Sequence, residues 1–206
     1  GTSFERRSGG AALLVEAGRL WDGAQFVPQP VPYGAKPRLI LAYLNTYAVR
    51  HRTREIDVGK SASAFLKMLG VQANGGKRGS YTEFKKQMTA LAAARMTFGF
   101  TQPAGIASTL DVKPIKRFDA WIARDERQPS LWPAILHLDE EYLKSLVEHA
   151  VPLPFEAISA LRDSALSLDL LAFFARRLST LDRPIRVPYV LFKEQFGQEY
   201  KDLKPF

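Results

Sequence analysis

The chain has 206 residues, of which 46% are hydrophobic and 24% charged, with a formal net charge of +8 and no cysteine. This composition is that of an ordinary globular protein, long enough for one large domain or two small ones. The lack of cysteine excludes disulfides, thiolate catalysis and cysteine-ligated zinc, and it fits a reducing cytosol. No apolar stretch reaches the roughly 18 residues that a membrane span needs, so we expect no membrane partner.

The positive charge is concentrated in one stretch of the chain. Residues 36–95 contain 12 Lys and Arg against 3 Asp and Glu, a net charge of +9, whereas the remaining residues have 17 basic and 18 acidic groups. A local basic field favours a polyanionic partner, most often nucleic acid, although a solvated basic surface without a partner has the same composition.

The first part of the chain is predicted to be an irregular arm, followed by a helix. Residues 1–35 contain a possible short strand at 12–16, a turn at Asp22-Gly23 and a run of prolines. The start lacks a methionine and an apolar signal core, which indicates an expression scar or an internal cut. Apolar residues at helical spacing then predict a largely buried helix over 38–51.

A short strand and a second helix are expected next. Alternating apolar residues predict the strand over 54–58. The helix over 62–69 has Ser61 or Ser63 as its N-cap, and Gly70 is placed to end it.

The segment "GVQANGGKRGSYTEFKKQM", residues 70–88, has two possible interpretations, a phosphate-binding loop or the turn before a DNA-binding helix. A phosphate-binding loop needs G-x-x-x-x-G-K-[ST] between a strand and a helix. Gly70 and Gly75 have the required spacing, but Gly76 occupies the lysine position and the preceding element is a helix. We therefore interpret the segment as the turn of a helix-turn-helix.

The helix after this turn is the candidate for DNA binding. Ser80 and Glu83 have the capping-box spacing, which predicts a helix that starts at Tyr81 and buries Phe84 and Met88. In a winged helix-turn-helix the second helix enters the major groove by its N-terminal half, where lysines contact phosphates or guanine edges and threonines contact bases. The predicted DNA-binding residues are Lys77, Arg78, Ser80, Tyr81, Thr82, Lys85, Lys86 and Thr89.

Strands after this helix would complete a wing. Residues 95–101 and 108–123 have strand patterns and would form a hairpin, with Pro114 weakening the second strand, and 131–138 would add a third strand. The hairpin at 95–123 or the strand at 131–138 would have an edge able to pair across the two-fold axis of a homodimer.

The last third of the chain is predicted to be mainly helical. Asp139 caps a helix over 140–149, and a second helical stretch over 156–181 is interrupted near 164–167. Residues 184–197, "PIRVPYVLFKEQFG", have the pattern of a strand followed by a short helix.

Other chemistry-bearing residues lack the spacing of a catalytic or metal site. His51, His137 and His149 do not have metal-ligand spacing, and no serine lies in a G-x-S-x-G motif. We therefore predict no enzyme activity, no metal and no cofactor.

Two stretches of the chain resemble RepA-type plasmid replication initiators. The first runs from "VPYGAKPRLI" to "AAARMTF" over residues 31–98, and the second is "LSLDLLAFFARRLSTLDRPIRVPYVLFKEQFG" over 166–197. The Pro-Tyr-Gly before the first helix, the Gly-Gly turn and the Val-Pro-aromatic…Gln-Phe-Gly ending occur in the family's order.

The resemblance implies an α+β fold made of an N-terminal arm at 1–35, a first winged helix with extra helices at 36–138, and connecting helices with the front of a second winged helix at 139–206. It implies a cytoplasmic bacterial protein that binds repeated origin sites (iterons) in double-stranded DNA, forms homodimers and controls plasmid copy number. Host replication proteins, such as a helicase or a DnaA-type initiator, would be its further partners.

The family pattern continues with another helix and a hairpin after "QFGQEYKDLKPF", so we expect a fragment that stops before the end of the second winged helix. Two other functions fit the same residues. One is a dimerisation or interaction module without strong DNA binding of its own, and the other is a winged-helix transcriptional repressor.

Overall fold

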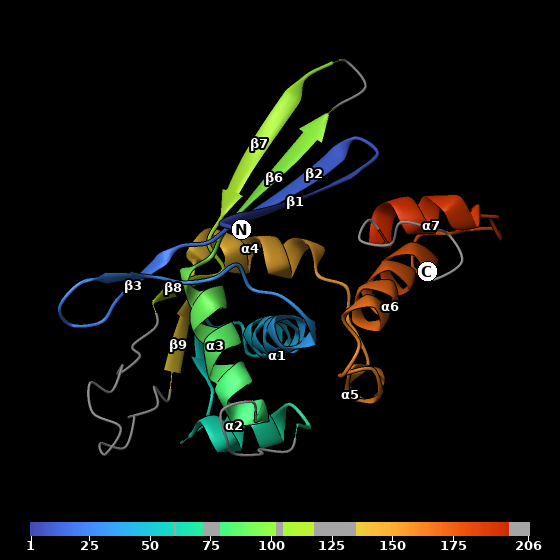
Figure 1. The fold of residues 1–206 in the computed structure, drawn as a ribbon. Coiled ribbons are helices and arrows are strands. Elements are labelled where there is room, and N and C mark those ends of the chain that lie inside the picture. Colours follow the sequence, from blue (N-terminus) through green and yellow to red (C-terminus); the bar gives the residue numbers. More distant parts are fainter. Residues whose placement is uncertain (60, 72–78, 102–104, 118–134, 198–206) are drawn as a thin grey trace.

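A computed structural model describes residues 1–59, 61–71, 79–101, 105–117 and 135–197. These residues form a mixed fold in which a four-stranded sheet projects from a helical body and the last three helices lie on one side of it (Figure 1). The elements in chain order are β1 (Ser3–Ser8), β2 (Ala11–Glu16), β3 (Arg19–Trp21), β4 (Phe26–Pro28), α1 (Ala35–His51), β5 (Glu55–Asp57), α2 (Ala62–Met68), α3 (Ser80–Ala93), β6 (Arg95–Thr101), β7 (Ala107–Val112), β8 (Ile115–Arg117), β9 (Ile135–Leu138), α4 (Glu140–His149), α5 (Phe155–Ala160), α6 (Ala165–Leu178) and α7 (Tyr189–Phe196).

The N-terminal arm forms two hairpins, so the prediction of an irregular arm is wrong, except for its one strand and for the turn at Asp22-Gly23, which joins β3 to β4. β1 and β2 pair along their length, and β2 pairs with β6, which gives an antiparallel sheet in the order β1-β2-β6-β7. The arm then crosses the end of α3 at Gly18, where a Cβ atom would lie 2.0 Å from the carbonyl oxygen of Ala93. Only glycine permits this close approach.

The predicted strand at 108–123 is divided at Pro114 into β7 and β8, which belong to different sheets. Proline lacks the N–H group that a ladder needs and therefore ends the strand. The hairpin of β6 and β7 is consequently half of the projecting sheet and not a separate two-stranded wing, while residues 118–123 lie outside the described part of the chain.

A second, three-stranded sheet has the order β5-β9-β8. β5 and β8 both pair antiparallel with β9, so the predicted third strand is confirmed at Ile135–Leu138. Because β9 is the middle strand, neither of its edges is free to pair with another subunit.

The main core lies between this sheet and the helices α1, α2 and α3. Phe65 of α2 and Phe84 of α3 are fully buried and meet edge to face, with ring centroids 5.7 Å apart. Helix α4 adds Tyr142, Leu143 and Leu146 to the same core. The buried members are Ile40, Leu44, Ala48, Ile56, Val58, Ala62, Phe65, Leu66, Leu69, Phe84, Met88, Leu91, Ala92, Ile115, Leu136 and Leu138.

The observed ends of α2 agree with the capping residues predicted from the sequence, whereas the start of α3 differs from the prediction. The Ser61 hydroxyl accepts a hydrogen bond from the Ala64 N–H at 3.1 Å, and Gly70 follows α2 with a φ of 72°. Helix α3 begins at Ser80 with Gly79 in the N-cap position, one residue before the predicted start at Tyr81. The Glu83 carboxylate, which a capping box would direct back to the helix start, accepts a hydrogen bond from Gln87 instead.

The last two helices are held together by a cluster of phenylalanine side chains. The predicted interruption near 164–167 is confirmed by the break between α5 and α6, whereas the predicted strand at the start of 184–197 is absent, since residues 184–188 are irregular. The Phe173 ring lies 5.6 Å from that of Phe192 and 5.3 Å from that of Phe196, which holds α7 against α6.

A single carboxylate connects three parts of the chain. Asp169 on α6 accepts hydrogen bonds from Nε and Nη2 of Arg38 on α1, at 2.6 and 2.7 Å. Nη1 of Arg6 on β1 lies 3.9 Å from the same carboxylate. Because the Asp169 side chain is only 27% exposed, this pairing is screened less than a surface ion pair.

Replacement of Asp169 with Asn should lower the free energy of unfolding by about 1 kcal/mol, because the bidentate pair of charged hydrogen bonds with Arg38 is replaced by a weaker interaction with a neutral amide. Urea denaturation followed by far-UV circular dichroism would measure the change. Asp182→Asn is the matched control, since Asp182 is exposed in the turn after α6. Equal midpoints for the two variants would contradict the stabilising role of the pairing.

Candidate nucleic-acid interface

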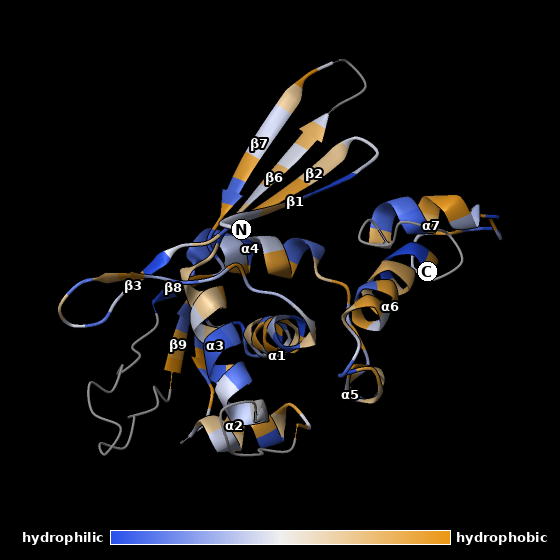
Figure 2. Cartoon of the chain, viewed as in Figure 1, coloured by the Kyte–Doolittle hydropathy of each residue, from blue (hydrophilic) through white to orange (hydrophobic). Residues whose placement is uncertain are grey.

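Helix α3 is the central helix of the body, and only its first half reaches the surface. It packs against α1, α2, β3 and β8, and its last four residues, Ala90–Ala93, are all buried. Figure 2 shows hydrophilic residues along the first half of α3 and hydrophobic residues towards its end. Any contact that α3 makes with a large ligand must therefore involve its N-terminal half.

Three of the predicted DNA-binding residues, at the start of α3 and just before it, lie wholly or partly outside the described part of the chain. Lys77 and Arg78 lie outside the described residues, as does the side chain of Ser80. Tyr81, the next residue, is half-buried and packs against the main core.

The remaining four predicted residues follow the first three turns of α3. Thr82 and Lys86 are exposed, and Lys85 and Thr89 are half-buried. The Thr89 hydroxyl donates within the helix, to the carbonyl oxygens of Lys85 at 3.1 Å and Lys86 at 3.0 Å. The structure thus brings Thr82, Lys85 and Lys86 to the surface of one half-helix, and their contact with DNA stays a prediction.

A network that the sequence did not predict ties the arm to this half-helix. Gln87 is only 1% exposed, and its Oε1 accepts a hydrogen bond from the backbone N–H of Tyr33 at 2.8 Å. Its Nε2 donates to Glu83 at 2.8 Å. The Lys86 Nζ lies over the Tyr33 ring, 5.5 Å from its centroid. The Glu-x-x-x-Gln spacing at 83–87 could have predicted the hydrogen bond between Gln87 and Glu83, because residues four apart are neighbours on a helix.

Glu83 is held ionised by its neighbours. The hydrogen bond from Gln87 lowers the pKa of the Glu83 carboxyl, and the Tyr33 hydroxyl and the charges of Lys86 and Lys36 act in the same direction, against a smaller opposing effect of burial. The basic face of α3 therefore contains one fixed negative charge beside Lys86.

Replacement of Gln87 with Met should raise the pKa of Glu83, because the side chain keeps its volume but loses the donor. In the unaltered protein the lowered pKa of Glu83 stabilises the fold at any pH above the ordinary pKa of a glutamate. This contribution is lost as the pH falls through the folded-state pKa. Titration of the Glu83 side-chain carbon by NMR would measure the shift. An unchanged midpoint in the variant would show that Gln87 does not control this carboxyl.

The described residues lack the features of two other kinds of site, a membrane span and a metal centre. Among the described residues, no helix is both long and apolar enough to span a membrane. Those residues also contain no group of three His, Asp or Glu arranged to hold a metal ion.

The arm segment at Tyr33, α1 and α3 all lie within one region that matches a known protein family. Residues 31–195 match the family model of the plasmid-encoded RepA protein. The chain belongs to the RepA family. Membership supports a role in the initiation of plasmid replication, as the sequence resemblance implied. No curated protein matches the chain.

Two solved structures share the fold of this RepA-family chain. A crystal structure of RctB domains 2 and 3 has a TM-score of 0.57 and 11% identity, and the match covers 98% of this chain and 72% of the other. A crystal structure of the selenomethionine derivatives of the same two domains has a TM-score of 0.60 and 10% identity, with the same coverage. Identities this low show a shared fold alone.

Proposed function

We propose that this RepA-family protein initiates plasmid replication by binding repeated sites of the origin in double-stranded DNA as a homodimer, without catalytic activity of its own. The observation that carries the proposal is the placement of Lys85 and Lys86 on the half of α3 that reaches the surface. Family membership supports the biological role, and the position of this half-helix supports contact with DNA through the start of α3.

The order of elements supports a winged helix for the body. In sequence, α1, β5, α2, α3, β8 and β9 give the series helix, strand, helix, helix, hairpin, and β5 completes the sheet of the hairpin. The β6–β7 hairpin is an insertion between α3 and β8 in this interpretation. α2 and α3 are then the helix-turn-helix, and the hairpin of β8 and β9 takes the place of the wing.

The first half of α3 has the charge and geometry that a DNA phosphate requires. The N-terminal N–H groups of a helix and the positive end of its dipole favour an anion. Lys85 and Lys86 add two positive charges within the next turn, and Thr82 adds a hydroxyl. Because the second half of α3 is buried, the duplex would approach from the N-terminal end of the helix.

Replacement of both Lys85 and Lys86 with Gln should weaken binding to origin repeats and lower the slope of log K against log salt by about 1 to 2 units, since each phosphate contact contributes ~0.9. Fluorescence anisotropy with a labelled duplex at several salt concentrations would measure the slope.

Lys144→Gln is the control for this prediction, because it removes one positive charge from the exposed surface of α4. It should leave the slope unchanged, whereas Lys86→Gln alone should lower it by about 0.9. Identical slopes for Lys86→Gln and Lys144→Gln would indicate a general charge effect, and the proposed role of α3 would be wrong.

The projecting sheet supports dimerisation through β7. The two edge strands of this sheet are β1 and β7. β1 carries Glu5, Arg6 and Arg7, and charged side chains protect an edge from pairing, whereas the one charge of β7, on Asp111, is paired with Arg95 at 2.8 Å. Figure 2 shows the hydrophilic character of β1.

An exposed apolar face accompanies the β7 edge. Leu110 pairs with Phe98, which pairs with Leu13, so these three side chains form one row on the same face of the sheet. Leu110 is 48% exposed and Phe100, in the next row, is 44% exposed. Pairing of β7 with its symmetry mate would extend the sheet and bring two such faces together.

Replacement of Leu110 with Asp should shift the protein towards monomer, because a charge is placed on the apolar face. Sedimentation velocity at several concentrations would measure the dissociation constant, which we expect to rise at least about tenfold. Thr109→Asp puts the same charge on the opposite face of the same strand, so it tests whether the face matters. A dimer that tolerates Leu110→Asp as well as Thr109→Asp would not use this face.

The two alternative functions make different predictions in the same experiments. A dimerisation module would respond to Leu110→Asp but show no salt-dependent DNA binding that depends on Lys85 and Lys86. A transcriptional repressor would protect a promoter operator from nuclease and leave the origin repeats open. Contact with a host helicase or a DnaA-type initiator is part of the proposal and would follow origin binding.

A further inference from the structure

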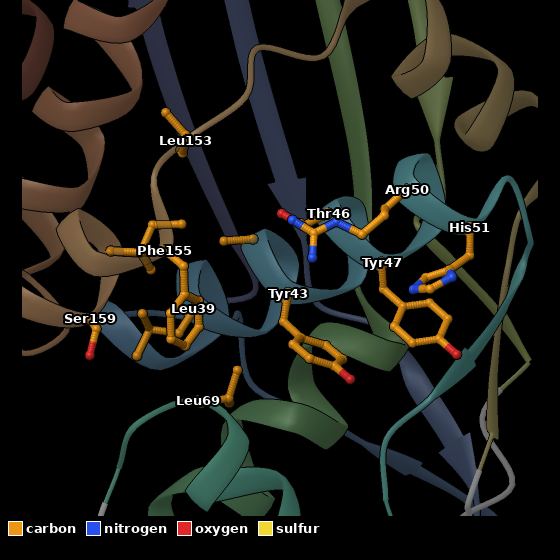
Figure 3. Close-up of a pocket in the computed structure, with 12 residues that line it drawn as sticks. Leu39, Tyr43, Thr46, Tyr47, Arg50, His51, Leu69, Leu153, Phe155 and Ser159 are labelled. Atoms are coloured by element: carbon orange, nitrogen blue, oxygen red, sulfur yellow. The ribbon is translucent and has the colours of Figure 1, made fainter.

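A cavity lies between α1 and the segment that leads into α5, away from the residues assigned to DNA or to dimerisation. Its volume is about 280 Å³. One wall is the face of α1 from Leu39 to His51, and the other wall consists of Leu153, Phe155 and Ile158, with Leu69 at the end of α2 below (Figure 3).

The two ends of the cavity differ in chemistry. Leu39, Leu69 and Phe155 gather at one end, and Arg50 and His51 lie at the other (Figure 3). Phe155 is 56% exposed, so more than half of its apolar surface is uncovered. The apolar end therefore offers a surface that a ligand could cover.

The basic end has an available cation. The Arg50 side chain forms no hydrogen bond or ion pair with any residue in the described part of the chain, whereas the side chains of Arg38 and Arg54 are paired with Asp169 and Glu140. None of the twelve lining residues is an Asp or Glu, so nothing in the wall would repel an anion. A planar guanidinium matches the geometry of a carboxylate.

We propose that this cavity binds a small amphipathic monocarboxylate, with its apolar body among Leu39, Leu69 and Phe155 and its carboxylate on Arg50. The size of the cavity limits the ligand to a single ring or a short chain. The aromatic rings of Tyr43, Tyr47 and Phe155 along the walls favour an aryl group as the body. Because the walls come from α1 and α5, the bound ligand would join the main core to the C-terminal helices.

The probes for this proposal are three molecules that share one apolar body: phenylbutyrate, phenylbutanol and phenylbutylamine. Ligand-observed NMR on the full chain should give dissociation constants in the order acid, alcohol, amine from tightest to weakest, with about 1 mM or tighter for the acid, as expected for a ligand of this size. No DNA is present, so failure here is distinguishable from failure of the proposed function.

Two substitutions test the two ends of the site. Arg50→Gln should weaken binding of the acid by about threefold to tenfold and leave the alcohol unchanged, because it removes only the charge contact. Thr46→Trp should abolish binding of all three probes, because Thr46 is exposed on the cavity-lining face of α1 and the larger side chain would fill the space.

Arg52→Asn is the matched control for Arg50→Gln. Arg52 is exposed two residues further along, outside the cavity lining, and asparagine tolerates its φ of 50°. This variant should bind all three probes as the unaltered protein does. Equal affinity for the acid and the alcohol in the unaltered protein would overturn the proposal, because the carboxylate would then make no contact. Binding that persists in Thr46→Trp would also overturn it, because the probes would then bind adventitiously at another place.

Discussion

The burial of α3 at the centre of the main core is the constraint on which the other features depend. Phe84 and Met88 are fully buried against the neighbouring helices, and the end of the helix is enclosed by β3 and β8. This packing fixes which half of α3 faces solvent. It also provides the platform on which the arm is anchored through Gln87, so the candidate DNA surface and the N-terminal sheet share one rigid support.

Local patterns in the sequence predicted the elements of the body and the hairpin of β6 and β7, but not the pairing of strands that are far apart in the chain. Helix periodicity, the Ser61 cap and Gly70 placed α1 and α2 because these signals act within a few residues. In the arm, β2 pairs with β6, far along the chain, and the charged residues of β1 conceal its strand pattern. Pro114 was recognised as a disruption, but a local pattern cannot show that the strands on its two sides join different sheets.

The candidate site was predictable to the same extent. The capping pattern located the start of α3 to within one residue, and the amphipathic pattern placed Lys85 and Lys86 on the side away from Phe84 and Met88. The Gln87 network and the cavity beside Arg50 are products of tertiary packing, since Tyr33 and Phe155 reach them from other segments. The positive charge near the candidate DNA-binding helix is therefore visible in the composition, whereas the groups that position or neutralise that charge can be identified only from the fold.

The pairing of β2 with β6 has a consequence for synthesis of the chain. Val15 of β2 pairs with Met96 of β6, so β1 and β2 are synthesised before α1, α2 and α3 and only afterwards meet their partner strand. A lone two-stranded hairpin is marginally stable in water, and the apolar side of the arm stays uncovered during this interval. The hairpin of β1 and β2 is thus open to chaperones and proteases until β6 has been synthesised and can pair with β2.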